Sequence, residues 1–191
     1  MPKTGEGRQP DAFYSAAGGE RIEVLFDAAA IGSRIEALAR EIAEGMSGDV
    51  LVVPILTGSF VFAADLIRAL QKTPLTPVVD FLSLASYGTG NRSGGRVEIL
   101  RDLEADPRGQ DILLVDDILD TGRTLAYAVD LLTARQAGRV ASCVLLDKVA
   151  ARAVAIEPDY CGFECPDVFV VGYGMDLAHR FRELPFVGRI V

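Results

Sequence analysis

Residues 116–124 hold the densest set of chemically capable side chains in the sequence. Asp116 and Asp117 follow a run of apolar residues, and Asp120-Thr-Gly-Arg-Thr124 forms a turn before the next apolar-periodic segment. Such a turn presents backbone N–H groups, two threonine hydroxyls and the positive end of a helix to one point, which suits a phosphate monoester. The two leading carboxylates suit vicinal hydroxyls or a divalent cation such as magnesium. A plain helix cap, the alternative interpretation, needs only one acidic residue.

Polar residues follow other apolar runs at 56–59, 86–95 and 147–148. The glycine-rich residues 88–95 predict a flexible loop suited to closing over a reactive intermediate, with a solvent-exposed hairpin turn as the alternative. Glycines 90 and 95 have the spacing of a Walker-A loop, but Arg96-Val97 follows where lysine and serine or threonine are needed. Residues 172–177 begin like a dinucleotide fingerprint but lack its third glycine. Neither look-alike predicts a nucleotide cofactor.

Apolar periodicity predicts the elements that must position these residues. Positions recurring at three and four predict an amphipathic helix over 27–44, with Asp27 able to cap it, and further helices over 59–71 and 124–136. Apolar runs predict strands over 50–56, 78–84, 97–100, 111–115, 141–146 and 168–171. The alternation of strand, helix and strand predicts an α/β fold with an open, mainly parallel twisted sheet flanked by helices. Ligands of such sheets bind beyond the carboxyl ends of the strands, where the polar junctions lie.

The composition of the 191 residues limits the class of protein further. With 50% hydrophobic and 24% charged residues the chain can bury a core, and its length suits one domain, which we expect over residues 21–191 after a flexible leader over 1–20. The net charge of −8 argues against nucleic acid and anionic membranes as partners. The longest apolar runs fall far short of the roughly 20 residues that span a bilayer. The polar N-terminus has no signal core, so the sequence predicts a cytoplasmic protein.

The three cysteines and the single histidine do not predict a metal centre. Cys143, Cys161 and Cys165 are too few and too unevenly spaced for a disulfide framework. A zinc site would need a second cysteine pair or more histidines than His179. We expect the thiols to fill core or surface positions, and His179 to be exposed.

Residues 115–125 resemble the 5-phosphoribosyl diphosphate (PRPP) fingerprint of the type I phosphoribosyltransferases. Further segments, in family order and together covering about residues 20–190, are similar to the hypoxanthine-guanine branch: 56–60, 64–66, 79–81, 86–88, 145–148, 158–163, 169–176 and 181–182. The resemblance implies the type I phosphoribosyltransferase fold, with a small hood contributed by the N-terminal and C-terminal segments. It also implies a magnesium-dependent enzyme that replaces the diphosphate of PRPP with a purine nitrogen.

The resemblance assigns the PRPP-binding residues one by one. Asp116 and Asp117 would hold the ribose hydroxyls and magnesium, and Asp120 would handle the proton at purine N7 as general base or acid. The 5′-phosphate would be bound by Thr121, Gly122, Arg123 and Thr124. Thr57 and Gly58 correspond to the diphosphate loop, although many family members have lysine or arginine in place of Thr57. Ser86 and Tyr87 correspond to the start of the closing loop.

Later segments correspond to the purine site. Lys148 matches the lysine that donates to the 6-oxo group, Phe169 the ring that stacks on the purine, and Val170 the backbone group that reads the base edge. Asp176 matches a second magnesium ligand, and Arg182 a residue that binds the departing diphosphate. Arg152 is also assigned to the diphosphate, although Val-Ala-Ala separates it from Lys148 where the family often has proline and paired arginines.

These assignments predict a purine-salvage transferase that makes IMP or GMP from PRPP and hypoxanthine or guanine, with xanthine as a further possible substrate. A lysine donor selects an oxo over an amino group, so adenine should be a poor substrate. Two alternatives stay open: an RNA-binding regulator with the same fold, and a transferase for another base such as a pyrimidine. By analogy we expect a homodimer or homotetramer. The ranking of the three bases is not predictable, because they differ at C2.

Overall fold

The structure is a computed structural model that describes residues 13–16, 19–87 and 96–191, with the backbone only at residues 86, 87 and 96. In these residues the main sheet has the order β6-β5-β3-β7-β8-β9, with β4 also paired to β3. All neighbours are parallel except β5 and β6. The predicted open, mainly parallel sheet is therefore confirmed. Its strands are β3 (Asp49–Leu56), β4 (Thr76–Val79), β5 (Leu82–Tyr87), β6 (Arg96–Arg101), β7 (Asp111–Leu119), β8 (Arg139–Asp147) and β9 (Tyr160–Glu164).

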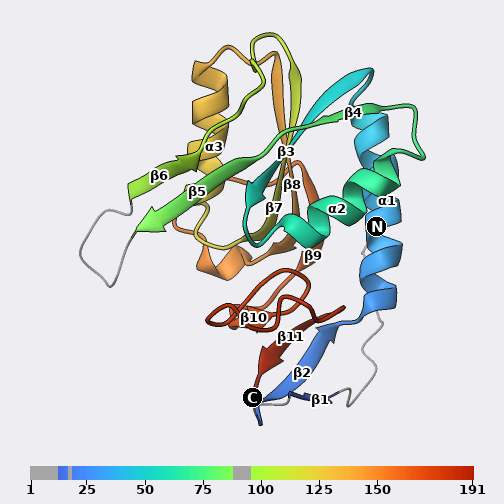
Figure 1. The fold of residues 1–191 in the computed structure, drawn as a ribbon, viewed down its shortest axis with the longest axis vertical. Helices are drawn as coiled ribbons and strands as arrows, with labels where there is room; N and C mark the ends of the chain where they lie inside the picture. Colours follow the sequence, from blue (N-terminus) through green and yellow to red (C-terminus); the bar gives the residue numbers. More distant parts are fainter. Residues whose placement is uncertain (1–12, 17–18, 88–95) are drawn as a thin grey trace.

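Helices cover both faces of this sheet (Figure 1). One face packs on α1 (Ala28–Gly45) and α2 (Phe60–Leu70), and the other on α3 (Arg123–Ala134). Successive residues of β3 alternate between the two cores: Val50 and Val52 lie in the first, Leu51 and Val53 in the second. A strand buried on both faces reads as a continuous apolar run. The predicted cap is also present, since the Asp27 carboxylate accepts a hydrogen bond from Ala30 N at 2.8 Å.

A second, smaller sheet joins the two ends of the chain. It has the order β1-β2-β11-β10, with all neighbours antiparallel, and consists of β1 (Phe13–Ser15), β2 (Arg21–Phe26), β11 (Val187–Ile190) and β10 (Val170–Val171). Ile22, Val171, Phe181 and Leu184 form a small core of its own. Figure 1 shows this sheet below the main one, and we identify it with the hood that the resemblance implied.

The structure corrects several predicted strands. Residues 78–84 are not one strand, because the extended segment is interrupted at Asp80, between β4 and β5. The buried Asp80 carboxylate accepts hydrogen bonds from the backbone N–H groups of Phe81, Glu104 and Ala105, at 2.7–2.9 Å. These bonds turn the chain, so that β4 pairs with the first half of β3 and β5 with its end.

Other elements differ in extent. β7 continues four residues beyond the predicted 111–115, through the acidic pair to Leu119. The strands β2, β9 and β11 were not predicted, and β1 occupies residues 13–15 of the expected leader. The rest of that leader, over 1–12 and 17–18, and the predicted closing loop over 88–95 lie outside the described residues. None of the described helices is both long and apolar enough to span a membrane.

Candidate active site

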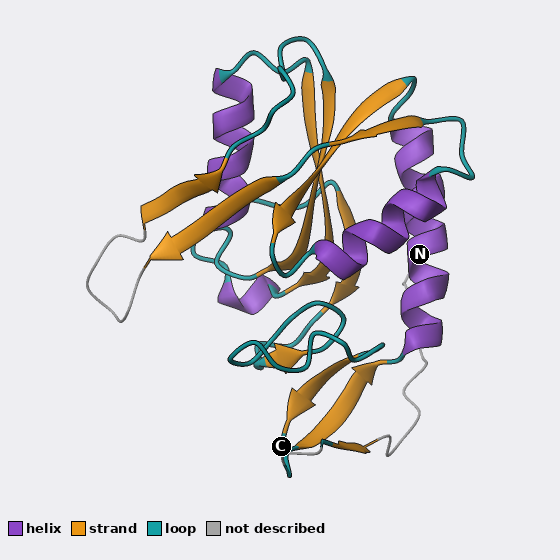
Figure 2. Cartoon of the chain, viewed as in Figure 1, coloured by secondary structure: helices purple, strands orange, loops and turns teal. Residues whose placement is uncertain are grey.

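A pocket of about 280 Å³ lies where the carboxyl ends of β3, β7 and β8 meet the chain around β10. Figure 2 shows the C-terminal loops beneath the arrowheads of these central strands. Every lining residue except Ile118 and Met175 was a predicted site residue. The lining consists of Thr57, Gly58, Asp117, Ile118, Asp120, Lys148, Phe169, Val170, Met175, Asp176 and Arg182. The expectation that ligands bind beyond the carboxyl ends of the strands and the resemblance to a known family therefore indicate the same pocket.

The loop after β3 approaches its neighbours closely. A Cβ atom at Gly58 would lie 2.0 Å from Asp117 Oδ2, and one at Gly174 would lie 2.3 Å from the Gly58 carbonyl oxygen. The buried Ser59 hydroxyl donates to Ile55 O at 2.6 Å, and the Leu56–Thr57 peptide bond is cis. A side chain at position 58 would therefore displace the Asp117 carboxylate.

The acidic end of β7 places two carboxylates in a desolvated environment. Asp116 is buried, and its Oδ1 accepts a hydrogen bond from Asp117 N at 3.0 Å. Burial raises the pKa of Asp116 well above its ordinary value, and the adjacent Asp117 charge raises it further. Burial also raises the pKa of Asp117, against the opposing influence of hydrogen bonds and Arg182. A bound cation would favour the ionised form of both groups.

These carboxylates fit the chemistry of a magnesium site. Magnesium is usually bound by one or two carboxylates together with water and substrate phosphates, and oxygen donors of this kind are what Asp117 and Asp176 bring to the pocket. Within the described residues no group of three or more His, Cys, Asp or Glu side chains could hold a metal. The predicted set of Asp116, Asp117 and Asp176 is thus not among such groups, and a magnesium ion at these carboxylates would need further oxygens from water or from the substrate.

The turn after β7 opens α3. Gly122 is the N-cap residue with a φ of 84°, a left-handed conformation that favours glycine, and a Cβ there would meet Ile156 at 2.8 Å. Thr121 and Arg123 are exposed and Thr124 is half-buried, so the turn is open to solvent beside the pocket. The Asp120 side chain is 48% exposed and lines the pocket. This is the geometry expected of a site for an external phosphate.

The predicted purine-binding residues also meet in the pocket. Lys148 is buried, and its Nζ lies 3.6 Å from Asp120 Oδ2. Phe169 is 58% exposed, whereas Val170 is buried in β10. A large exposed ring beside a buried ammonium group offers a stacking surface and a hydrogen-bond donor to a flat heterocycle.

Asp176 and Arg182 form an ion pair at the edge of the pocket. Arg182 Nη2 lies 2.7 Å from Asp176 Oδ1, and Arg182 Nη1 donates to Gly174 O at 2.5 Å. The other Asp176 oxygen accepts a hydrogen bond from His179 N at 2.7 Å. The His179 side chain is 96% exposed, as predicted.

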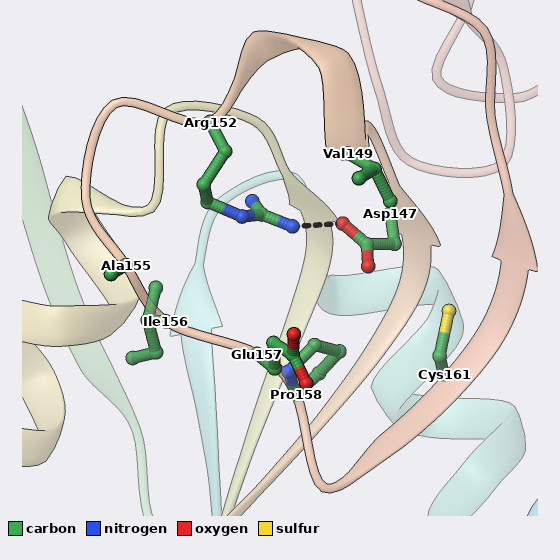
Figure 3. A pocket seen from close by; sticks show the side chains of 8 residues that line it. All are labelled: Asp147, Val149, Arg152, Ala155, Ile156, Glu157, Pro158 and Cys161. Atoms are coloured by element: carbon green, nitrogen blue, oxygen red, sulfur yellow. Dashed lines mark hydrogen bonds and ion pairs between the residues drawn. The ribbon is translucent and has the colours of Figure 1, made fainter.

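Several predicted site residues lie outside this lining. Arg152 faces a neighbouring pocket of about 540 Å³, where it pairs with Asp147 (Figure 3). Ser86 and Tyr87 end β5, where their backbones pair with Val97 and Arg96, and their side chains are not described. Asp116 and residues 121–124 lie next to the pocket in the chain without lining it.

Two lining residues, Ile118 and Met175, were not predicted. Each is an apolar residue beside predicted polar ones, so composition alone carried no signal for it. The one available signal was adjacency: Ile118 lies inside the motif of 115–125 and Met175 inside that of 169–176. Cys143 and Cys165 are buried and Cys161 is half-buried, as expected of cysteines that fill core or surface positions.

Comparisons with known proteins show the family to which the chain belongs. The phosphoribosyl transferase domain family matches residues 22–178. Hypoxanthine phosphoribosyltransferase of Escherichia coli K12 is 42% identical over 173 residues, which cover 89% of this chain and 96% of that protein. Hypoxanthine-guanine phosphoribosyltransferase of Aquifex aeolicus is 40% identical over 171 residues, covering 88% and 94%. A crystal structure of a Bacillus anthracis hypoxanthine-guanine phosphoribosyltransferase has a TM-score of 0.83 at 36% identity, covering 88% and 98%.

The chain therefore belongs to the phosphoribosyltransferase family and has its fold. Within that family it is an enzyme of the hypoxanthine-guanine type, as the resemblance of its motifs predicted.

Proposed function

We propose that this enzyme transfers the phosphoribosyl group of PRPP to hypoxanthine or guanine, releasing diphosphate and forming IMP or GMP. The observation that carries the proposal is the convergence of Lys148, Asp120 and Asp117 in one pocket, beside the open turn of residues 121–124. One side of the pocket offers donors to an oxopurine, and the other offers carboxylates and amides to a ribose phosphate.

On the ribose side, Asp116 and Asp117 accept hydrogen bonds from the ribose hydroxyls, and residues 121–124 bind the 5′-phosphate. The developing positive charge at C1′ is stabilised by the nearby carboxylates. The backbone of Thr57 and Gly58 binds the diphosphate, because Thr57 has no cationic side chain. Arg182, at the pocket edge, meets the same group as it leaves.

On the purine side, Lys148 donates to the 6-oxo group and Phe169 stacks on the ring. Val170 reads the base edge through its backbone. Asp120, 3.6 Å from the Lys148 ammonium group, handles the proton at purine N7. An amino group at C6 would place a donor against the lysine donor, so the site rejects adenine.

Magnesium fits this proposal as a partner of the substrate. It would be held by Asp116 and Asp117 on the ribose side and by Asp176 on the diphosphate side. When bound, it supplies positive charge that stabilises the leaving diphosphate. Asp176 would have to exchange its contact with Arg182 for that role.

The proposal is tested by incubating the protein with PRPP, magnesium and each of hypoxanthine, guanine, xanthine and adenine. We expect nucleotide from hypoxanthine or guanine and little from adenine. Asp120→Asn should mainly lower kcat. The absence of nucleotide from both oxopurines would refute the proposal, and formation of a pyrimidine nucleotide instead would favour the transferase for another base.

The hypoxanthine-type relatives at 40–42% identity favour the enzyme over the RNA-binding regulator. A homodimer or homotetramer and a cytoplasmic location stay predictions. Light scattering coupled to gel filtration would measure the assembly directly.

A further inference from the structure

The segment of residues 148–156 lies directly behind the turn of residues 119–122. Lys148 N donates to Leu119 O at 2.9 Å, and the N–H groups of Ala153 and Val154 both donate to Thr121 O at 3.0 Å. The contact is close, because a Cβ on Gly122 would lie 3.2 Å from both Arg152 Cδ and Val154 O. The turn is thus held from behind by a segment that contributes only Lys148 to the pocket lining.

Arg152 supplies the side-chain part of this support. Its Nη1 donates to Leu119 O at 3.1 Å and to Asp120 O at 2.8 Å, and its Nη2 contacts Asp147 Oδ1. Both side chains of the ion pair are largely buried, with 15% and 13% exposed. Figure 3 shows the guanidinium group directed at Asp147. Both N–H groups of Nη1 are therefore used on the turn.

The direction of these carbonyls determines the direction of the amides. In a trans peptide the C=O of one residue and the N–H of the next point in opposite directions. Carbonyls of residues 119, 120 and 121 are held toward the supporting segment. The N–H groups of residues 120, 121 and 122 must then point away from it, toward the open side of the turn. Successive N–H groups that point to one side of a turn can form an anion-binding concavity.

We propose that Arg152, braced by Asp147, is a positioning residue that holds the turn with its amides directed at the 5′-phosphate. This role replaces the assignment of Arg152 to the diphosphate, and it rests on the proposed function only in taking the turn as the 5′-phosphate site. Arginine suits it because its planar fork carries donors on separate nitrogens in fixed directions toward two carbonyls and a carboxylate, whereas the donors of an ammonium group all lie on one nitrogen.

Binding of two ligands distinguishes a positioning role of Arg152 from direct contact with the diphosphate. Ribose 5-phosphate probes the turn, and inorganic diphosphate with magnesium probes the diphosphate loop. We expect Arg152→Ala to raise the Kd for ribose 5-phosphate at least tenfold while changing the Kd for diphosphate less than twofold, measured by calorimetry. An Arg152 that binds diphosphate directly would give the reverse pattern and overturn the proposal. An equal weakening of both ligands would also overturn it.

Arg34 provides a matched control. Like Arg152, it donates to two backbone carbonyls, Gly162 O and Cys161 O, and it pairs with a carboxylate, Glu41. It lies on α1 and contacts β9, outside the pocket lining. We expect Arg34→Ala to lower thermal stability to a similar degree with unchanged Kd for both ligands. If Arg34→Ala weakens ribose 5-phosphate as much as Arg152→Ala, the effect is general loosening and the proposal fails.

Two milder variants keep the test decisive if Arg152→Ala does not fold. Arg152→Lys keeps the positive charge but removes the planar guanidinium group, and Asp147→Asn removes the carboxylate that pairs with Arg152. Each should raise the Kd for ribose 5-phosphate at least threefold, and unchanged binding in both would refute the proposal. Failure of the proposed function is distinguishable, since a wild-type protein that binds ribose 5-phosphate but forms no nucleotide would refute only the reaction.

Discussion

Gly58→Ala should impair activity by displacing one carboxylate. The new Cβ would lie 2.0 Å from Asp117 Oδ2 and 2.7 Å from Asp117 Cγ. Non-bonded carbon and oxygen atoms rarely approach closer than about 3.3 Å, so the carboxylate must move by more than about 1 Å. A misplacement of about 1 Å at a reacting centre costs roughly 100-fold in rate. We therefore expect kcat/KM for hypoxanthine and PRPP to fall about 100-fold, or about 2.7 kcal/mol in transition-state free energy.

The control for this variant is Gly32→Ala on the exposed face of α1. A Cβ there has no atom within 4 Å, so activity should be unchanged and the helix should gain about 0.5–1 kcal/mol. Steady-state rates of nucleotide formation and urea unfolding of both variants give the comparison. Activity of Gly58→Ala within threefold of wild type would show that Asp117 can move without loss, and the reasoning from this contact would be wrong.

Three further outcomes are expected. Lys148→Ala should lower the ratio of kcat/KM for hypoxanthine over adenine at least tenfold, since the donor to the 6-oxo group is lost; an unchanged ratio would remove Lys148 from base recognition. Burial opposes ionisation of Asp80, but its backbone hydrogen bonds hold its pKa below the usual value. The stability that the ionised carboxylate contributes to the folded state is therefore present above about pH 4 and is lost as the pH falls further. Asp80→Ala should thus cost about 1–3 kcal/mol at pH 7 by urea unfolding, with a deficit that shrinks below pH 4; a pH-independent deficit would contradict this. Tyr173→Phe removes a buried hydroxyl that donates to Asp65 and should cost about 1 kcal/mol, whereas an unchanged urea midpoint would mean that the contact contributes nothing.

Local sequence patterns were enough to predict the strands whose ends form most of the pocket. The apolar runs of β3, β7 and β8 are buried on both faces, and their polar ends are adjacent because neighbouring parallel strands end at one edge. The order of motifs added what periodicity could not, namely Phe169 and Asp176 from the distant C-terminal segment. Those two residues reach the pocket beside β10, a strand of only two residues.

The parts of the fold that the sequence did not predict depend on contacts between residues far apart in the chain. β11 pairs with β2 across nearly the whole chain, and no local pattern in Val187–Ile190 signals that partner. The break at Asp80 has the same origin, because its carboxylate is held by N–H groups more than 20 residues away, at Glu104 and Ala105. The proposed role of Arg152 could not be predicted either. An arginine that donates to backbone carbonyls and an arginine that binds a phosphate look the same in a sequence.

The orientation of backbone amides also explains how a chain of net charge −8 can bind a substrate with phosphate at both ends. In the proposed function, acidic residues of the pocket face the ribose, the purine proton and the metal, where negative charge is useful. In the same proposal the 5′-phosphate and the diphosphate are contacted largely by N–H groups, whose direction depends on where the opposite carbonyls are held. Arg152 donates to two of those carbonyls, and its charge is already paired with Asp147. A cation behind the turn can therefore matter to phosphate binding without adding net charge to the site, which composition cannot reveal.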